Sequence, residues 1–468
     1  RRGSDPFCHG LLARADVGLL ITVNWLLSPP MRFMENRVKQ VCYIIVSVAC
    51  MTSSGLRSED WRQFRGPNGA ASSSDTNLPT TWSDTDNLQW KTELPGPGSS
   101  SPIVVGNQIF VTCYSGYGVP KSSSGDLKSL KRHLVCIKRN DGTIAWTKTI
   151  AGDTPEDAYQ GYISEHGYAS NTPVSDGERV YCFFGKSGVL AFDLAGKELW
   201  RVNVGKESSN RRWGSAASLI LHKSMLIVNA SEESQSIRAL DKLTGKEIWK
   251  ASGSAMELAY GTPAVVALKD REDVVVAVPG EVWGLNSETG KLRWFAEHQL
   301  TGNICPSIVA NGETVYVFGG FRSSGSLALK VGGDQKDVTK SNILWTERNS
   351  SYVATPVLVS DHLYWVNDAG QAYCVNARTG ALVYRERVPG LDSGGRPVYA
   401  SPVVAGDKIY VPTRWSGVLV MAAKPEFKIL SQNKFAADES DFNATPAISD
   451  GHLYLRSNRY LYSVGGKK

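Results

Sequence analysis

The chain has 468 residues, of which 42% are hydrophobic and 21% are charged, and 51 Lys and Arg against 45 Asp and Glu give a formal net charge of +6. Part of that excess lies in the N-terminal leader, and the body has no long run of Lys or Arg, so we expect no nucleic-acid partner. The sequence has no G-x-S-x-G, H-E-x-x-H or P-loop motif, which argues against the enzyme classes that depend on them.

The N-terminal region has two parts. Residues 1–30 begin without methionine, and their apolar patches are too short to span a bilayer, so we treat them as an upstream segment of uncertain status. Residues 31–58 combine a basic start, an apolar core and small residues suited to cleavage, which is the pattern of a signal peptide. We therefore expect a periplasmic or secreted protein with no transmembrane domain in the mature chain. Cys50 leaves a lipid anchor open as an alternative, although Ser47 stands where such signals usually have Leu.

A repeated unit dominates the rest of the chain, and its clearest copy is residues 352–386. Four runs there alternate apolar and polar residues between turn sequences, which predicts four antiparallel strands. A small residue followed by proline opens most copies, and Ala217 stands in for that proline in one of them. From proline to proline the steps are 71, 44, 46, 43, 50, 46 and 44 residues. The anchors are Ser101-Pro102, Thr172-Pro173, Thr262-Pro263, Cys305-Pro306, Thr355-Pro356, Ser401-Pro402 and Thr445-Pro446.

A second marker in the repeat is a turn glycine four positions before an aromatic residue, as in Gly245 and Trp249. Glycine supplies the positive φ that such a turn needs, and the aromatic residue falls in the fourth strand. A large ring at a fixed place in each sheet can pack against the neighbouring sheet, so we interpret these rings as contacts between sheets. The other pairs are Gly142 and Trp146, Gly196 and Trp200, Gly290 and Trp294, and Gly380 and Tyr384.

These copies predict an all-β fold, an eight-bladed β-propeller of four-stranded antiparallel blades over residues 88–466, with residues 59–87 as an N-terminal extension. The eighth copy lacks a fourth strand, whereas residues 88–92 precede the first copy and contain Trp90. We expect this N-terminal strand to complete the last blade, because closing the ring removes two exposed sheet edges.

The repeat resembles that of PQQ-type (quinoprotein-like) β-propellers, whose Asp, Thr-Gly and Trp pattern is matched around Asp241, Gly245 and Trp249. Residues 61–69 also resemble a leader found in many secreted bacterial propellers of this type. The resemblance implies an architecture similar to that of the outer-membrane assembly propeller lipoprotein. It does not determine a chemistry, because one fold serves many functions.

Two insertions interrupt the start of the propeller, between Thr112 and His133 and from Ala151 to Ala169, and the first is predicted to be a long exposed loop. Loops between second and third strands lie on the same face as loops that leave fourth strands, so both insertions are expected on one face. Aromatic and arginine side chains are enriched in binding hot spots, and these loops carry many. We predict a ligand site there made by His166, Tyr168, Arg212, Trp213, Tyr260, Arg322, Tyr352, Arg414 and Trp415, in loops that also hold Arg396, Tyr399 and Asn443. Rings that merely plug the channel are the alternative.

The sequence therefore predicts a non-catalytic binding or scaffold propeller, monomeric, whose partner is a protein, a peptide or a small molecule. The resemblance also implies a PQQ-dependent alcohol or aldose dehydrogenase as an alternative, with PQQ and Ca²⁺ as cofactors. The chain has no adjacent cysteine pair and no matching Glu, Asn and Asp set, so we expect no cofactor or metal and assign no catalytic residue. A sensor propeller related to those fused to serine/threonine kinases is the second alternative.

Five cysteines follow the signal segment, and each stands alone within a predicted strand. We interpret them as small buried hydrophobic residues, with a disulfide between Cys113 and Cys136 as the alternative in an oxidising compartment.

Overall fold

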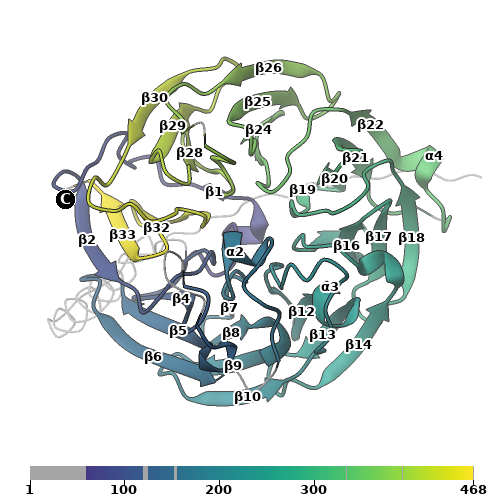
Figure 1. Cartoon of the computed structure of the whole chain (residues 1–468). Helices are drawn as coiled ribbons and strands as arrows, with labels where there is room; N and C mark the ends of the chain where they lie inside the picture. Colours follow the sequence, from purple (N-terminus) through teal and green to yellow (C-terminus); the bar gives the residue numbers. More distant parts are fainter. Residues whose placement is uncertain (1–59, 120–124, 152–154, 334, 393, 467–468) are drawn as a thin grey trace, which may run out of the picture. The chain divides into compact units, whose positions relative to one another are not determined.

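The computed structural model describes residues 60–119, 125–151, 155–333, 335–392 and 394–466. The predicted upstream segment, the predicted signal peptide and Cys50 lie outside these residues. Within the described ranges, no helix is both long enough and apolar enough to cross a lipid bilayer. The described strands form eight sheets around a central axis (Figure 1), which confirms the predicted all-β, eight-bladed propeller.

The blades are numbered here in chain order from the first complete one. Blade 1 contains β3 (Ile103–Val105), β4 (Gln108–Ser115), β5 (Lys131–Lys138) and β6 (Ile144–Ala151). Blade 2 contains β7 (Val174–Ser175), β8 (Arg179–Phe183), β9 (Val189–Asp193) and β10 (Glu198–Val202). Blade 3 contains β11 (Ile220–His222), β12 (Met225–Ala230), β13 (Ser236–Asp241) and β14 (Glu247–Ser252). Blade 4 contains β15 (Ala264–Ala267), β16 (Glu272–Val278), β17 (Glu281–Asn286) and β18 (Leu292–Glu297).

The second half of the ring repeats the same order. Blade 5 contains β19 (Val309–Asn311), β20 (Thr314–Gly319), β21 (Gly325–Lys330) and β22 (Ile343–Glu347). Blade 6 contains β23 (Val357–Val359), β24 (His362–Val366), β25 (Gln371–Asn376) and β26 (Leu382–Arg387). Blade 7 contains β27 (Val403–Ala405), β28 (Lys408–Pro412), β29 (Val418–Ala422) and β30 (Ile429–Asn433), and β1 (Ser72–Ser73) is its fifth strand. Blade 8 contains β31 (Ala447–Ser449), β32 (His452–Arg456), β33 (Tyr460–Gly465) and β2 (Leu88–Glu93).

Helical turns are short and lie in the connections. They are η1 (Pro67–Gly69), η2 (Leu127–Ser129), α2 (Ile163–His166), η3 (Gly185–Ser187), α3 (Ser231–Ser234), η4 (Ser254–Met256) and α4 (Thr339–Asn342).

Burial follows the position of a strand within its blade. Every residue of β29 is buried, because a middle strand is covered by the blades on both sides. The outer strand β6 instead alternates between exposed and partly buried residues along most of its length. The outer strand of blade 8 comes from the N-terminal side of the chain, because β2 pairs antiparallel with β33 and Trp90 lies opposite Ser463.

The fourth-strand tryptophans contact the next blade, as the sequence predicted. The Nε1 of Trp200 donates to the Lys242 carbonyl of blade 3 at 3.1 Å, and its ring lies under the turn glycine Gly245. Four other tryptophans make the same bond to the following blade: Trp90 to Arg139, Trp146 to Leu194, Trp249 to Ser287 and Trp345 to Ala377. Trp294 differs, since its Nε1 donates at 2.8 Å to Asp273 of its own blade.

The substitution Gly245→Ala tests this blade contact. Gly245 has a φ of +72°, and an added Cβ would lie 2.6 Å from the Trp200 ring. Gly312 has a similar φ of +56° with nothing within 4 Å, so Gly312→Ala introduces the same backbone strain without the clash. We expect Gly312→Ala to lower the free energy of unfolding by about 1 kcal/mol. Gly245→Ala should lower it by a further 1 to 3 kcal/mol, roughly, in urea denaturation. Equal losses in the two variants would contradict the role of Trp200 as a contact between blades.

Hydroxyl side chains link the inner ends of successive blades. The backbone N–H of Ser101 donates to Thr172 Oγ1 at 3.0 Å, and six further junctions repeat this bond. The later acceptors are Ser218, Thr262, Ser307, Thr355, Ser401 and Thr445. The anchor of blade 5 is therefore Ser307 and not Cys305, and that of blade 3 is Ser218. The prediction used proline as the marker, but the hydrogen bond between blades requires a hydroxyl oxygen and not a proline ring.

Two further expectations were tested. The prediction of a long loop from Thr112 was wrong at its ends, because β4 continues to Ser115 and Leu130 is buried beside Tyr114. The extra length forms a strand extension because aromatic side chains of the second insertion cover it.

The five described cysteines are all free, so the disulfide alternative is wrong. Cys113 lies opposite His133 and Cys136 lies opposite Phe110, so the two are not cross-strand partners.

Candidate functional site

The N-terminal segment crosses one end of the central channel. Trp61 exchanges backbone hydrogen bonds with Val104 of blade 1, while Arg65 donates to the carbonyls of Thr355 and Pro356 at 2.8 and 2.7 Å. β1 then pairs in parallel with β27 of blade 7. Figure 1 shows this purple segment reaching the centre of the ring. It contacts turns between first and second strands, such as Gly106, so it covers the face opposite the long loops.

Residues 155–169, here called the arm, cross the other end of the channel. α2 lies in the arm and is seen near the centre of the ring in Figure 1. Glu165 forms an ion pair of 2.8 Å with Arg414 of blade 7, and its carbonyl accepts from Asn443 at 2.9 Å. Because Arg414 belongs to a loop between second and third strands, this ion pair confirms that the two kinds of loop share one face. The arm therefore bridges distant blades across the channel mouth.

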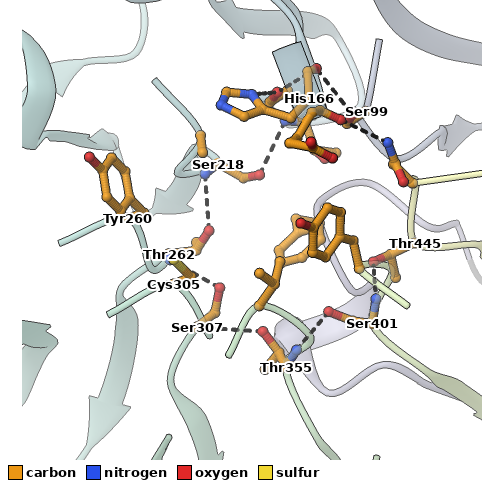
Figure 2. A pocket seen from close by; sticks show the side chains of 18 of the residues that line it. Ser99, His166, Ser218, Tyr260, Thr262, Cys305, Ser307, Thr355, Ser401 and Thr445 are labelled. Carbon is orange, nitrogen blue, oxygen red and sulfur yellow. Dashed lines mark hydrogen bonds between the residues drawn. The ribbon is translucent and has the colours of Figure 1, made fainter. Parts of the chain in front are cut away.

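A cavity of about 180 Å³ lies between the arm and Phe64 of the N-terminal segment. Figure 2 shows its wall, where a chain of hydrogen bonds runs from Ser218 to Thr445 through the hydroxyl groups of four intervening blades. The Oγ atoms in this chain accept backbone N–H groups. Aromatic rings form the side of the cavity nearest the arm: Tyr162, Trp213, Tyr260, Tyr352 and Tyr399.

Five rings form a continuous row across the channel mouth, here called the aromatic strip. Its members, in spatial order, are Phe321, Tyr352, Tyr162, Trp213 and Tyr260. Successive ring centroids are 6.1, 6.4, 4.4 and 6.0 Å apart. These spacings lie near the range of favourable aromatic pairs, so the strip is a packed surface and not a set of isolated rings.

Comparison with known proteins agrees with this fold. A family model described as "Outer membrane protein assembly factor BamB" matches residues 124–251 and 233–464, which together exceed half of the chain. The chain belongs to the BamB family. The BamB protein of Shewanella oneidensis is 24% identical over 238 residues, which cover 47% of this chain and 57% of that protein. The chain thus aligns with little more than half the length of this curated relative.

Solved structures extend the likeness to most of the ring. The crystal structure of BamB from Moraxella catarrhalis has a TM-score of 0.55 at 16% identity, covering 80% of this chain and 96% of that one. The computationally designed protein Ika8 has a TM-score of 0.54 at 13% identity, covering 80% of this chain and 98% of that one. At these identities the likeness shows the fold alone.

In this BamB-family chain, the predicted site residues fall into three groups. His166, Trp213, Tyr260 and Tyr352 line the cavity. Arg212 and Arg322 are exposed, and both have positive φ values. The remaining three lie elsewhere: Tyr168, in the arm itself, packs against Tyr114 and Tyr117, while Arg414 and Trp415 both bond Asp441 beside a second cavity of about 200 Å³.

Sequence reasoning missed several residues of this site. Phe64 and Tyr162 come from the two segments that close the channel, and Phe321 is the exposed end of the aromatic strip. The hydroxyl chain was partly visible as the small residue before each proline. Tyr162 and Phe64 had no comparable signal, because neither belongs to the repeat.

His166 and Glu165 are both held by structural contacts. Burial holds the pKa of His166 below its ordinary value, so the ring is neutral near pH 7. Its Nε2 lies 2.8 Å from the Trp213 carbonyl, which can only accept, and its Nδ1 lies 2.5 Å from Ser170 Oγ. The Nε2 therefore carries the proton, and Nδ1 accepts from the serine hydroxyl. Neither ring nitrogen is free to transfer a proton in this arrangement.

The base of the arm rests on a group of buried charges. Arg132 pairs with Glu156 at 2.7 Å, and Lys186 pairs with Asp157 at 2.9 Å. Glu233 of α3 is buried beside them, and its Oε2 has no hydrogen-bond partner among the described residues. Burial raises the pKa of Glu233 to about 8, and it raises the pKa values of Glu156 and Glu232 as well.

The substitution Glu233→Gln should remove one source of pH dependence. Below about pH 8 the folded chain keeps Glu233 protonated, whereas the unfolded chain ionises it above about pH 4.3. Between these values the folded state holds the extra proton, so its stability falls as pH rises. We expect the stability of the variant relative to the parent to increase by about 1 kcal/mol per pH unit from about pH 5 to about pH 8. Glu207→Gln, on an exposed neighbour, is the control and should show no such trend. A constant difference for Glu233→Gln would be the contrary result.

Proposed function

We propose that this chain is a non-catalytic binding propeller that works outside the cytoplasm and holds a protein partner on the face crossed by the arm. The observation that supports this proposal most is a contrast at the channel mouth. The titratable side chains there are held by hydrogen bonds and an ion pair, whereas the aromatic side chains keep exposed surface. Glu165 and His166 are tied to Arg414, Ser170 and Trp213. General acid–base catalysis needs a proton site that faces a reactant, which these two groups do not offer.

The aromatic and arginine side chains of the same face support the proposal because they remain accessible to a partner. Tyr162, Trp213 and Tyr352 keep part of their surface exposed, and Phe321 is 46% exposed. Partly exposed aromatic rings surrounded by arginines are the common composition of protein-binding hot spots. The BamB relatives are outer membrane protein assembly factors, which supports a location outside the cytoplasm and a protein as the partner.

The dehydrogenase alternative fits the cavity less well. PQQ is a flat quinone with three carboxylate groups, so its site needs cationic side chains. No Lys or Arg is among the described residues that line the cavity, and Glu165 adds a negative charge there. We therefore derive no redox step for this chain.

Cross-linking in the native cell tests the proposal. Phe321→Ala with Tyr352→Ala shortens the aromatic strip, and Leu243→Ala with Leu344→Ala removes similar exposed apolar area from outer strands and turns. Cross-linked partners identified by mass spectrometry should disappear in the first double variant and persist in the second, with both variants folded by thermal unfolding. Partners that persist in the first variant would place the binding surface elsewhere and refute the proposal.

A further inference from the structure

We propose that the partner presents an extended acidic peptide segment to the aromatic strip, with one aromatic side chain of that segment inserted into the cavity. This inference rests on the proposed function, because it names the chemistry that the same face would recognise.

Unpaired positive charge lies at the Phe321 end of the aromatic strip and beside Trp213, its fourth ring. Arg211 and Arg212 stand beside Trp213, and Arg322 follows Phe321. All three are exposed, and none forms an ion pair with a residue in the described ranges. The guanidinium of Arg211 lies 5.8 Å from the centroid of the Trp213 ring, so charge and aromatic surface are adjacent.

A further arginine lies over the middle of the strip. The guanidinium carbon of Arg396 is 4.5 Å from the Tyr352 ring centroid and 5.7 Å from that of Tyr162. Asp368 pairs with its Nε at 3.4 Å, but its Nη1 is buried and has no hydrogen-bond partner among the described residues. The Arg396 side chain is 33% exposed, so the accessible part of its guanidinium can still bind a carboxylate oxygen of a ligand, and such charge-assisted bonds are stronger than neutral ones.

Nearby carboxylates neutralise only part of this surface. Glu165 is held by Arg414, and Asp368 is held by Arg396. Glu257 accepts the Asn210 backbone N–H at 2.7 Å. Arg211, Arg212 and Arg322 therefore keep their charge available to a ligand of the opposite charge, and the strip favours acidic over basic segments.

The cavity provides a place for one ring. Its volume of about 180 Å³ is close to that of an engineered apolar cavity of about 150 Å³ in another protein that binds benzene. Tyr162, Trp213 and Tyr352 belong both to its wall and to the strip, so a ring entering it would continue the packed row. Burying a phenylalanine side chain contributes roughly 1.5 to 3 kcal/mol, so this ring is expected to be the main anchor.

A single-stranded nucleic acid also uses aromatic and arginine surfaces, but this face suits it less. Such a strand needs a continuous basic track for its phosphates. The arginines here are interrupted by Glu165 and Asp368, and the chain carries no long run of Lys or Arg. We therefore assign the site to a peptide and include an oligonucleotide in the test.

The test uses fluorescence anisotropy with the whole chain and a fluorescein-labelled peptide of sequence Gly-Asp-Glu-Phe-Glu-Asp-Gly. The comparison probes replace its Phe with Ala, replace its acidic residues with Lys, or are a labelled oligo-dT. We expect the first peptide to bind tightest, with an affinity that falls as NaCl rises. Loss of the Phe should weaken binding by roughly tenfold or more.

Two protein variants complete the test. Arg211→Ser with Arg322→Ser should weaken binding of the acidic peptide by about two- to fivefold per arginine. Arg385→Ser with Arg387→Ser removes two exposed arginines from the outer strand β26 and should change nothing. The inference is overturned if the acidic peptide does not bind, if the Lys peptide or oligo-dT binds as tightly, or if the two double variants behave alike. Cross-links to the strip that persist alongside any of these results would leave the proposed function standing and remove only the acidic-peptide assignment.

Discussion

Arg456→Ala is expected to lower the free energy of unfolding by about 3 to 5 kcal/mol. Arg456 lies in β32 of blade 8 and is almost fully buried, yet it forms no ion pair with a carboxylate of the described residues. Its guanidinium donates to the carbonyls of Ser100 and Thr112, both at 2.7 Å, and also to Ser100 Oγ. Alanine would leave these buried acceptors of blade 1 unpaired and would create a cavity.

The effect is expected to be large because of where this arginine lies. Seven junctions between blades use a backbone-to-hydroxyl bond, but Ser101 Oγ, which faces blade 8, has no hydrogen-bond partner among the described residues. Arg456 takes over that junction, where the two ends of the propeller meet. The control is Arg459→Ala, which removes an exposed arginine paired with Glu93 and should cost less than about 1 kcal/mol. Urea denaturation curves of similar midpoint for the two variants would show that Arg456 does not hold the junction.

Arg65→Ala is expected to lower the free energy of unfolding by about 2 to 4 kcal/mol and to release the N-terminal segment from the channel. Arg65 donates to the carbonyls of Gly69, Thr355 and Pro356, and burial lowers its pKa to about 9. Its loss leaves three carbonyls without their donor. Because Phe64 precedes Arg65, the end of the cavity that Phe64 lines should open as well.

Arg62→Ala is the matched control, since Arg62 lies in the same segment but is about half exposed and pairs with Asp60. Thermal unfolding should show a lower midpoint only for Arg65→Ala, and the amide of Trp61, which bonds the Val104 carbonyl, should exchange faster in that variant. Slow exchange of Trp61 in Arg65→Ala would mean that β-bridge pairing alone holds the segment.

The architecture could be predicted because each copy of the repeat carries the same local signals for its turns and strands. Gly245 and Trp249 recur as a turn glycine and a fourth-strand ring, and both have the geometry that this pattern requires. The blade count followed from the same periodicity. The anchor of blade 5 was misplaced by two residues because proline was taken as the marker, whereas the hydroxyl of Ser307 and not Cys305 accepts the bond.

The site was less predictable because two non-repeating segments build it. The ion pair between Glu165 and Arg414 joins residues far apart in the sequence, and no local pattern indicates it. Arg65 and Arg456 are buried, although arginine is seldom fully buried, so sequence alone favours an exposed position for both. Trp213 and Tyr352 were predicted because they stand just before successive first strands, where the loops of one face converge on the central channel.

Amide hydrogen exchange tests most directly whether the arm face is the binding surface. The chain is measured alone and as a complex with its partner that has been cross-linked in native cells and then purified. We predict added protection in the arm, around Trp213 and around Phe321, with no change in the turns that hold the N-terminal segment, such as Gly106. Protection confined to that opposite face or to the outer strands would contradict the account.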